Sequence, residues 1–321
     1  MLKKFLKNHP IHKKIVPYLD TFFIYNPTLF FAVWVMICIG MYIFHSDTLL
    51  YPQWLTSVIN FKTICLFISL TFLTGALFIK QQIIIYELDK IRNERSPLHI
   101  FISKDKAVNI INVSLAISFF TVLLTNIYNL FLSILLFFIL NFYINKKYTL
   151  LKIYQQYFLL FFISVLLIFN GYVIAFSDKS YFFSLFNIFN IDFFLKIFFY
   201  ALAVLPIFIM MQILEFTNRF ILRFFSCLIM LIVFICSFIF NNPFLSISSI
   251  CSLPFLLYAL FRNLNKDLSR SVKYPLFVFN FFISTIYPYM FIPLILIFYI
   301  SKYYYWHRFD IHFPTFLVEN D

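Results

Sequence analysis

The sequence predicts an all-α, polytopic membrane protein built as a bundle of nine transmembrane helices. Of its 321 residues, 63% are hydrophobic and 12% are charged, and the mean hydropathy is +0.91. The apolar residues form long runs, each near the roughly 20 residues that a helix needs to cross about 30 Å of hydrocarbon. A soluble domain cannot bury so much apolar surface, and a transmembrane β-barrel would instead show alternating segments of about ten residues.

The apolar spans follow one another with short connections, which indicates one nine-helix transmembrane domain at residues 21–301. A basic cytoplasmic arm, residues 1–20, precedes this domain, and an aromatic tail, residues 302–321, follows it. Tight junctions such as residues 241–243 are expected to break the helices. The predicted spans are 22–45, 62–88, 107–125, 127–145, 153–176, 193–217, 220–240, 244–261 and 275–300.

The composition also predicts how these helices pack. The chain has only three glycines, against 50 phenylalanines and 21 tyrosines. Since membrane helices commonly use glycine where they approach closely, we expect wider helix contacts filled by aromatic side chains. The five cysteines lie inside apolar spans without a Cys-x-x-Cys pair and are interpreted as small buried hydrophobic residues.

The distribution of charge predicts the orientation. The arm and the loops after the second, fourth, sixth and eighth spans hold 19 of the 25 basic residues, so the positive-inside rule places the N-terminus in the cytoplasm and the C-terminus outside. We expect an integral protein of a bacterial inner (plasma) membrane. The net charge of +12 belongs to loops beside the lipid bilayer and does not indicate binding to nucleic acid. We therefore expect no nucleic acid partner. The 19 are Lys3, Lys4, Lys7, Lys13, Lys14, Lys90, Arg92, Arg95, Lys104, Lys106, Lys146, Lys147, Lys152, Arg219, Arg223, Arg262, Lys266, Arg270 and Lys273.

A charged stretch at the end of the second span, residues 80–95, stands out from this apolar background. Helical spacing places Gln81, Ile85 and Asp89 on one face, with Glu87 close to it. Acids and amides at the inner end of a helix bundle, followed by a basic loop, suit a divalent metal and a phosphorylated lipid. The alternative is a helix end that extends its charges into water, with a solvated loop behind it.

Residues 82–98, QIIIYELDKIRNERSPL, resemble the first aspartate-rich motif of the UbiA superfamily of intramembrane prenyltransferases. That motif has the pattern Asn-x-x-x-Asp-x-x-x-Asp. Gln81 stands at its Asn position, Ile85 at its first Asp position, and Asp89 at its last. The positions that match without a gap are Gln82, Ile83, Glu87, Leu88, Asp89, Lys90, Ile91, Pro97 and Leu98.

The resemblance implies a UbiA-like bundle with a cavity that opens to the inner leaflet between the second and sixth spans. In this family, two aspartate-rich motifs face each other and hold Mg²⁺ ions that bind the diphosphate of an isoprenoid lipid. The second motif corresponds to residues 205–220, where Glu215 is the one acidic residue. We therefore expect the second and sixth spans to pack together with Asp89 and Glu215 at the same depth.

From this resemblance, the expected metal ligands are Asp89, Glu87 and Glu215. Each has a plainer explanation, because Glu215 can pair with Arg219 on its own helix, and the other two with neighbouring basic residues. The expected substrate-binding residues are Gln81, Lys80, Arg92, Arg95 and Lys104. For the basic residues among these, the plainer interpretation is a charge at the membrane boundary.

The predicted function is that of a divergent UbiA-type prenyltransferase homologue that acts on or binds an isoprenoid diphosphate lipid, with weak or lost catalysis. Ile85 and the scarcity of acids around Glu215 remove much of the expected metal site. The alternative is a non-catalytic membrane protein that binds a lipid or a partner and retains the UbiA fold. A transporter would show broken helices and internal repeats, neither of which is clear in this sequence.

Overall fold

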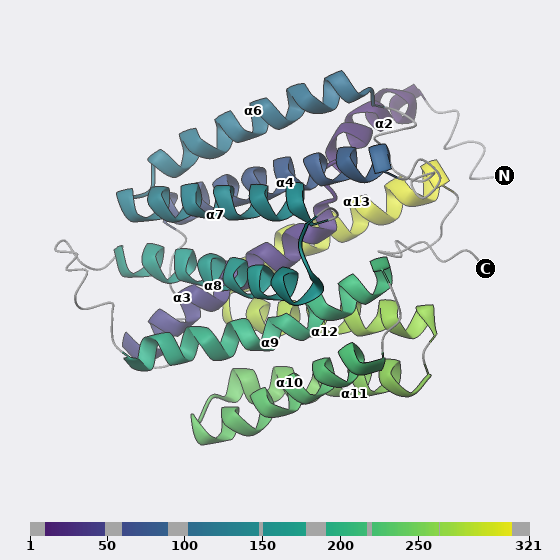
Figure 1. Cartoon of the computed structure of the whole chain (residues 1–321). Helices are drawn as coiled ribbons and strands as arrows, with labels where there is room; N and C mark the ends of the chain where they lie inside the picture. Colours follow the sequence, from purple (N-terminus) through teal and green to yellow (C-terminus); the bar gives the residue numbers. More distant parts are fainter. Residues whose placement is uncertain are drawn as a thin grey trace.

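The computed structural model describes residues 10–48, 60–88, 102–147, 150–177, 191–216, 220–262 and 264–309, and the regular structure in these ranges is entirely helical. The long helices run side by side in one bundle (Figure 1). The elements are α2 (Pro10–Phe23), η1 (Pro27–Leu29), α3 (Phe30–Thr48), α4 (Phe61–Leu88), α6 (Lys104–Leu123), α7 (Ile127–Lys146), α8 (Ile153–Ser177), α9 (Ile191–Phe216), α10 (Phe220–Ile239), α11 (Pro243–Arg262), α12 (Asn265–Ile286), η3 (Pro288–Met290) and α13 (Phe291–Phe309).

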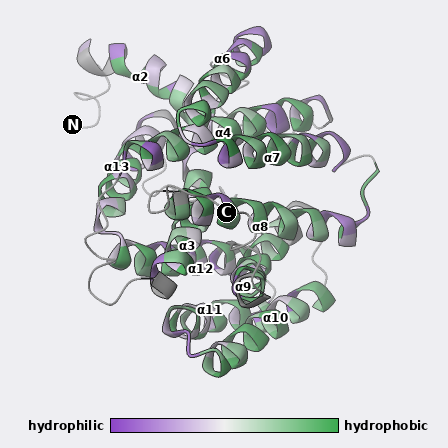
Figure 2. Cartoon of the chain, turned by 90° about the vertical axis from the view of Figure 1, so that its left-hand side faces the viewer, coloured by the Kyte–Doolittle hydropathy of each residue, from purple (hydrophilic) through white to green (hydrophobic). Residues whose placement is uncertain are grey.

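Seven of these helices are long and apolar enough to cross a membrane: α4 and the six from α6 to α11. They coincide with the second to eighth predicted spans, and hydrophobic residues cover most of their ribbons (Figure 2). The first predicted span corresponds to a shorter apolar helix, Phe30–His45. The all-α polytopic class is confirmed, whereas the number of nine spans stays a prediction.

The first span begins later than predicted because the chain turns sharply before it. Asn26 has a φ of 51°, in the left-handed region that asparagine tolerates better than most residues. Pro27 follows at the start of η1, and its ring prevents the preceding residue from continuing a helix. As a result, α2 and α3 are separate helices.

The last predicted span, residues 275–300, is wrong as a single helix. It covers the end of α12 and the start of α13, which η3 separates at Pro288. At this break the Tyr287 hydroxyl lies 3.0 Å from Nδ1 of His45, near the end of α3. At the far end of α13, the Tyr304 hydroxyl donates to Oδ1 of Asp20 in α2, over 2.9 Å.

Helix α13 therefore crosses the bundle and ends beside α2 (Figure 1). The rings of Tyr304 and Phe23 stack there with centroids 4.0 Å apart. The described ends of α13 and α2 thus meet at the same end of the bundle, and the predicted sides of the two termini stay predictions. The assignment of that end to the cytoplasm stays a prediction.

Labelling of single cysteines tests this contact between α13 and α2. We expect Lys14→Cys and Lys302→Cys to react with a membrane-impermeant maleimide from the same side of sealed vesicles, because both positions are exposed and α13 meets α2 through Tyr304 and Asp20. The unsubstituted chain is the control for reaction of its own cysteines. Labelling of the two variants from opposite sides would contradict the path of α13.

Helices α3 and α8 cross at the centre of the bundle. Their backbones approach each other more closely than the low glycine content predicted. A methyl group at Gly40 would lie 1.9 Å from the carbonyl oxygen of Ile168, and one at Gly171 would lie 2.0 Å from that of Ile37. Two of the three glycines thus allow backbone-to-backbone contact at one crossing. The expectation of wide, aromatic-filled contacts is wrong here.

Candidate lipid-binding cavity

A cavity of about 110 Å³ lies within the half of the bundle that faces α2, between α3, α4, α7, α8 and α9. Its walls are mainly aliphatic and aromatic. The hydroxyl of Thr74 donates to the carbonyl oxygen of Leu70 over 2.7 Å, so its hydrogen is used within α4. The apolar lining consists of Leu29, Ala32, Val33, Met36, Phe78, Leu140, Ile144, Leu160, Ile163, Leu167, Phe208 and Met211.

Polar groups gather where α4 and α7 approach their C-terminal ends. Gln81 comes from the last two turns of α4, and Tyr143 and Lys147 come from the end of α7. Lys147 is only 5% exposed, and its ammonium nitrogen lies 5.7 Å from the centroid of the Tyr143 ring. A buried cation at one end of an apolar cavity suits a ligand with an apolar chain and an anionic head.

Sequence reasoning assigned Lys147 to a cytoplasmic loop and missed its place in the cavity. The signal was weak, because Lys146 and Lys147 are adjacent and periodicity alone does not show which of them faces inward. The backbone N–H of Lys147 still donates to the carbonyl of Tyr143, which continues the helical pattern by one residue. That extra residue carries the lysine to the buried side of α7.

The cavity lies between the second and sixth predicted spans, as the resemblance implied. Thr74, Phe78 and Gln81 of α4 line it, and Phe208 and Met211 of α9 do so from another wall. Within the described residues, α4 packs mainly on α6 and α7, whereas α9 packs mainly on α10, α8 and α12. The described parts of the two helices meet around a shared cavity, and their packing at the depth of Asp89 and Glu215 stays a prediction.

The other predicted site residues do not join Gln81 in the described cavity lining. Lys80 turns away from the cavity lining and donates to Oδ1 of Asn141 in α7 over 2.7 Å. Glu87 and Lys104 are exposed and form an ion pair between α4 and α6. Asp89, Arg92 and Arg95 lie outside the described residues; Glu215 lies in α9, but its side chain is also outside the described part.

Comparison with known proteins adds one finding to this geometry. No family model and no curated protein sequence matches the chain. A solved structure of digeranylgeranylglyceryl phosphate synthase, an intramembrane prenyltransferase of the UbiA type, matches with a TM-score of 0.53 over 88% of this chain and 98% of that one. This chain has the UbiA-type fold. At 14% identity, the match establishes the fold alone.

The described part of this UbiA-type bundle does not supply a magnesium site. Within the described residues, no group of three or more His, Cys, Asp or Glu side chains could hold a metal ion. The described residues of the cavity lining include no carboxylate, and Glu87 is engaged by Lys104. Since Mg²⁺ in proteins is held by carboxylates together with substrate phosphates, the Mg²⁺ prediction now depends on Asp89 and Glu215.

The contact between Lys80 and Asn141 leads to a prediction about stability. Asn141→Leu removes the acceptor that the structure gives to a partly buried ammonium group, and we expect it to destabilise the protein by about 1–3 kcal/mol. Lys80→Met replaces the charge with an apolar chain of similar length, so its effect should be smaller. Thermal unfolding in one detergent measures both. Equal stability of Asn141→Leu and the unsubstituted protein would show that this contact contributes little.

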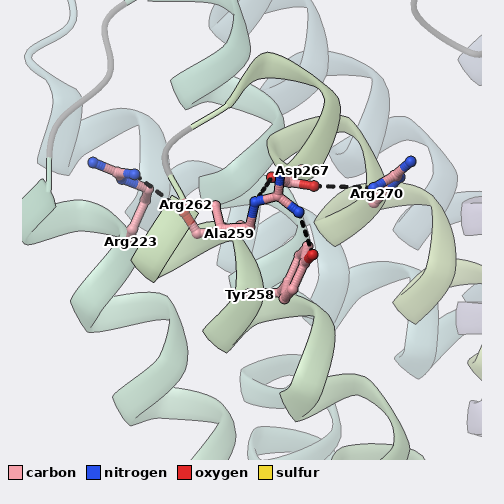
Figure 3. A network of polar contacts seen from close by, with 6 residues as sticks. All are labelled: Arg223, Tyr258, Ala259, Arg262, Asp267 and Arg270. Atoms are coloured by element: carbon pink, nitrogen blue, oxygen red, sulfur yellow. Dashed lines mark hydrogen bonds and ion pairs between the residues drawn. The ribbon is translucent and has the colours of Figure 1, made fainter.

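A second charged cluster, far along the chain from the cavity, joins α11 to α12 (Figure 3). Asp267 is 1% exposed and pairs with Arg262 at 3.5 Å and with Arg270 at 3.1 Å. Nearby, Arg223 of α10 donates from Nη1 to the carbonyl oxygen of Ala259, over 3.1 Å. These contacts connect three helices at one end, so we interpret the cluster as structural.

Proposed function

We propose that this protein is a divergent UbiA-type homologue that binds an isoprenoid diphosphate lipid in the cavity between α4 and α9, with prenyl transfer weak or lost. The observation that carries the proposal is the apolar cavity with the buried ammonium group of Lys147 at one end. Gln81, at the Asn position of the first motif, lies in the same lining.

The two parts of such a lipid match the two parts of the cavity. The apolar walls suit isoprene units, because apolar surface that leaves water is stabilised by about 25 cal/mol for each Å² buried. Lysine binds phosphate as a compact positive charge, so Lys147 is the proposed contact for the diphosphate. Arg92, Arg95 and Lys104 stay predicted contacts near the same end.

The proposed weakness of catalysis follows from the electrostatics of diphosphate departure. The diphosphate gains negative charge as the allylic C–O bond breaks, and positive groups must stabilise that charge. In the UbiA family, aspartates hold the Mg²⁺ ions that supply this positive charge. Ile85 occupies one of these aspartate positions, and its side chain is partly buried in α4. Losing one electrostatic group of an active site commonly reduces the rate by about 10²–10³.

The second candidate function is lipid or partner binding without any chemistry. The contact between Glu87 and Lys104 favours it, because the ion pair uses a carboxylate that a metal would otherwise need. The described residues are compatible with both candidates, so an activity measurement separates them.

We expect the purified protein to show little or no Mg²⁺-dependent prenyl transfer from prenyl diphosphates to candidate acceptors. The control is an active UbiA-type enzyme measured in parallel, and the expected deficit is at least about 10²-fold. Asp89→Ala should leave the residual rate unchanged. Robust turnover that requires Mg²⁺ and disappears in Asp89→Ala would show that the protein is an ordinary prenyltransferase.

A further inference from the structure

Helix α6 lies at the edge of the bundle, as Figure 1 and Figure 2 show from two sides. Within the described part of the chain it packs mainly on α4. Only 22% of its apolar stretch is buried, the lowest share among the seven candidate membrane spans. In a single copy of the protein, most of the surface of α6 therefore faces lipid.

The side of α6 that faces the bundle satisfies its polar groups. The hydroxyl of Ser114 donates to the carbonyl oxygen of Ile110 over 2.6 Å and lies 2.6 Å from the Tyr25 hydroxyl. Ser69 of α4 donates to the carbonyl oxygen of Ser118 over 2.9 Å. These partners are what a membrane helix requires, because hydrocarbon offers no water to bond polar groups.

The outward side of α6 carries two asparagines, Asn109 and Asn112, which lie one helical turn apart and are both exposed. Neither has a hydrogen-bond partner among the described residues. Apolar side chains continue this side, with Val113 59% and Phe120 65% exposed. Asn112 lies about 12 Å along the helix from Lys104, near the middle of the span. An unpaired carboxamide is unfavourable in hydrocarbon, so this side of α6 requires a partner.

The chemistry of the carboxamide indicates which partner. Its NH₂ group donates and its oxygen accepts, so it is complementary to itself. Copies of one membrane protein share one orientation in the bilayer, and a two-fold axis normal to the membrane therefore brings each residue level with its own counterpart. Asn112 would meet Asn112 of the second copy at the same depth. Each of the two can then donate to the other and accept from it.

We infer that this protein forms a homodimer through the outward side of α6, with a reciprocal pair of Asn112 hydrogen bonds at its centre. Asparagine side chains that bond across helices stabilise association in membranes, and Asn109 extends the same contact by one turn. The inference goes beyond the proposed prenyl function and does not rest on it, because no described residue of α6 lines the lipid-binding cavity. Prenyl diphosphate binding should be the same in monomer and dimer.

The test is Förster resonance energy transfer between full-length copies fused to donor or acceptor fluorescent proteins, in phosphatidylcholine vesicles of varied protein-to-lipid ratio. We expect saturable transfer above the level of random proximity. Asn112→Leu should raise the dissociation constant of the dimer by at least about tenfold, because it removes both hydrogen bonds of the pair. Asn112→Gln keeps a carboxamide and should retain most of the affinity. The matched control is Asn145→Leu, at an exposed asparagine near the end of α7, which should associate like the unsubstituted protein.

Several results would overturn the inference. Transfer at the random level in the unsubstituted protein would exclude the second copy as the partner of α6. An unchanged dissociation constant in Asn112→Leu, or equal weakening in Asn112→Leu and Asn145→Leu, would remove the role of Asn112. Thermal unfolding of the monomers in detergent checks the fold of each variant. A lower melting temperature of Asn112→Leu would assign this side chain to a contact within one copy and contradict the dimer.

Discussion

Gly40→Ala and Gly171→Ala are each expected to destabilise the protein severely. The added methyl group at Gly40 would lie 1.9 Å from the Ile168 carbonyl oxygen and 2.6 Å from the backbone N of Tyr172. These neighbours are backbone atoms of another helix and cannot rotate away as a side chain can, so α3 and α8 would have to separate. Overpacking costs about 1–3 kcal/mol in ordinary cores and sometimes more. We expect the upper end of that range here.

The third glycine provides the matched control. A methyl group at Gly75 would meet the side chains of Tyr25, at 2.7 Å, and Phe30, at 3.3 Å, and rings can shift where backbone cannot. Gly75→Ala should therefore lower the melting temperature less than either of the other two. The yield of monodisperse protein and its thermal unfolding measure all three variants. A Gly40→Ala protein as stable as Gly75→Ala would contradict the close crossing of α3 and α8.

Lys147→Gln is expected to weaken the binding of a prenyl diphosphate by at least about tenfold. The substitution removes a buried positive charge at the end of the cavity, and charge-assisted hydrogen bonds contribute about 1.5–3 kcal/mol. Lys146→Gln is the control, because the neighbouring lysine has the same charge and does not line the cavity. Equilibrium binding of geranylgeranyl diphosphate to the protein in nanodiscs gives the comparison.

The uncharged prenyl alcohol distinguishes loss of charge from loss of structure. Its binding should depend on the apolar walls and should be similar in Lys147→Gln and in the unsubstituted protein. Equal weakening of the diphosphate in Lys146→Gln and Lys147→Gln would assign the effect to general electrostatics at the membrane surface. In that case Lys147 would lose its proposed role.

The bundle could be predicted from sequence largely because hydrocarbon imposes a simple requirement on the chain. Each apolar run has to satisfy its own backbone hydrogen bonds as a helix, so seven long helices appeared where apolar runs did. The errors occurred where local backbone geometry decides. Pro288 and the φ of 51° at Asn26 break apolar runs that hydropathy treats as continuous, and the break at Pro288 reverses the direction of the chain.

The candidate site could be predicted only in part, because its residues come from helices far apart in the sequence. The motif resemblance placed Gln81 correctly at the end of the second span, and the structure puts it in the cavity lining. It could not show that Lys80, one residue earlier, turns toward Asn141 instead. Lys147 carries no motif, and its position depends on how α7 packs against α4 and α8.

The most direct test of the central claim is to fill the cavity and measure prenyl diphosphate binding. Ala32 of α3 lies in the lining, and Ala32→Phe places a ring in the space that the isoprene units would occupy. Ala116→Phe introduces the same ring on the exposed face of α6 and serves as control. We predict that the unsubstituted protein and Ala116→Phe bind geranylgeranyl diphosphate equally, whereas Ala32→Phe remains folded and loses binding. Unchanged binding by a folded Ala32→Phe protein would show that the lipid occupies another place and would contradict the proposed function.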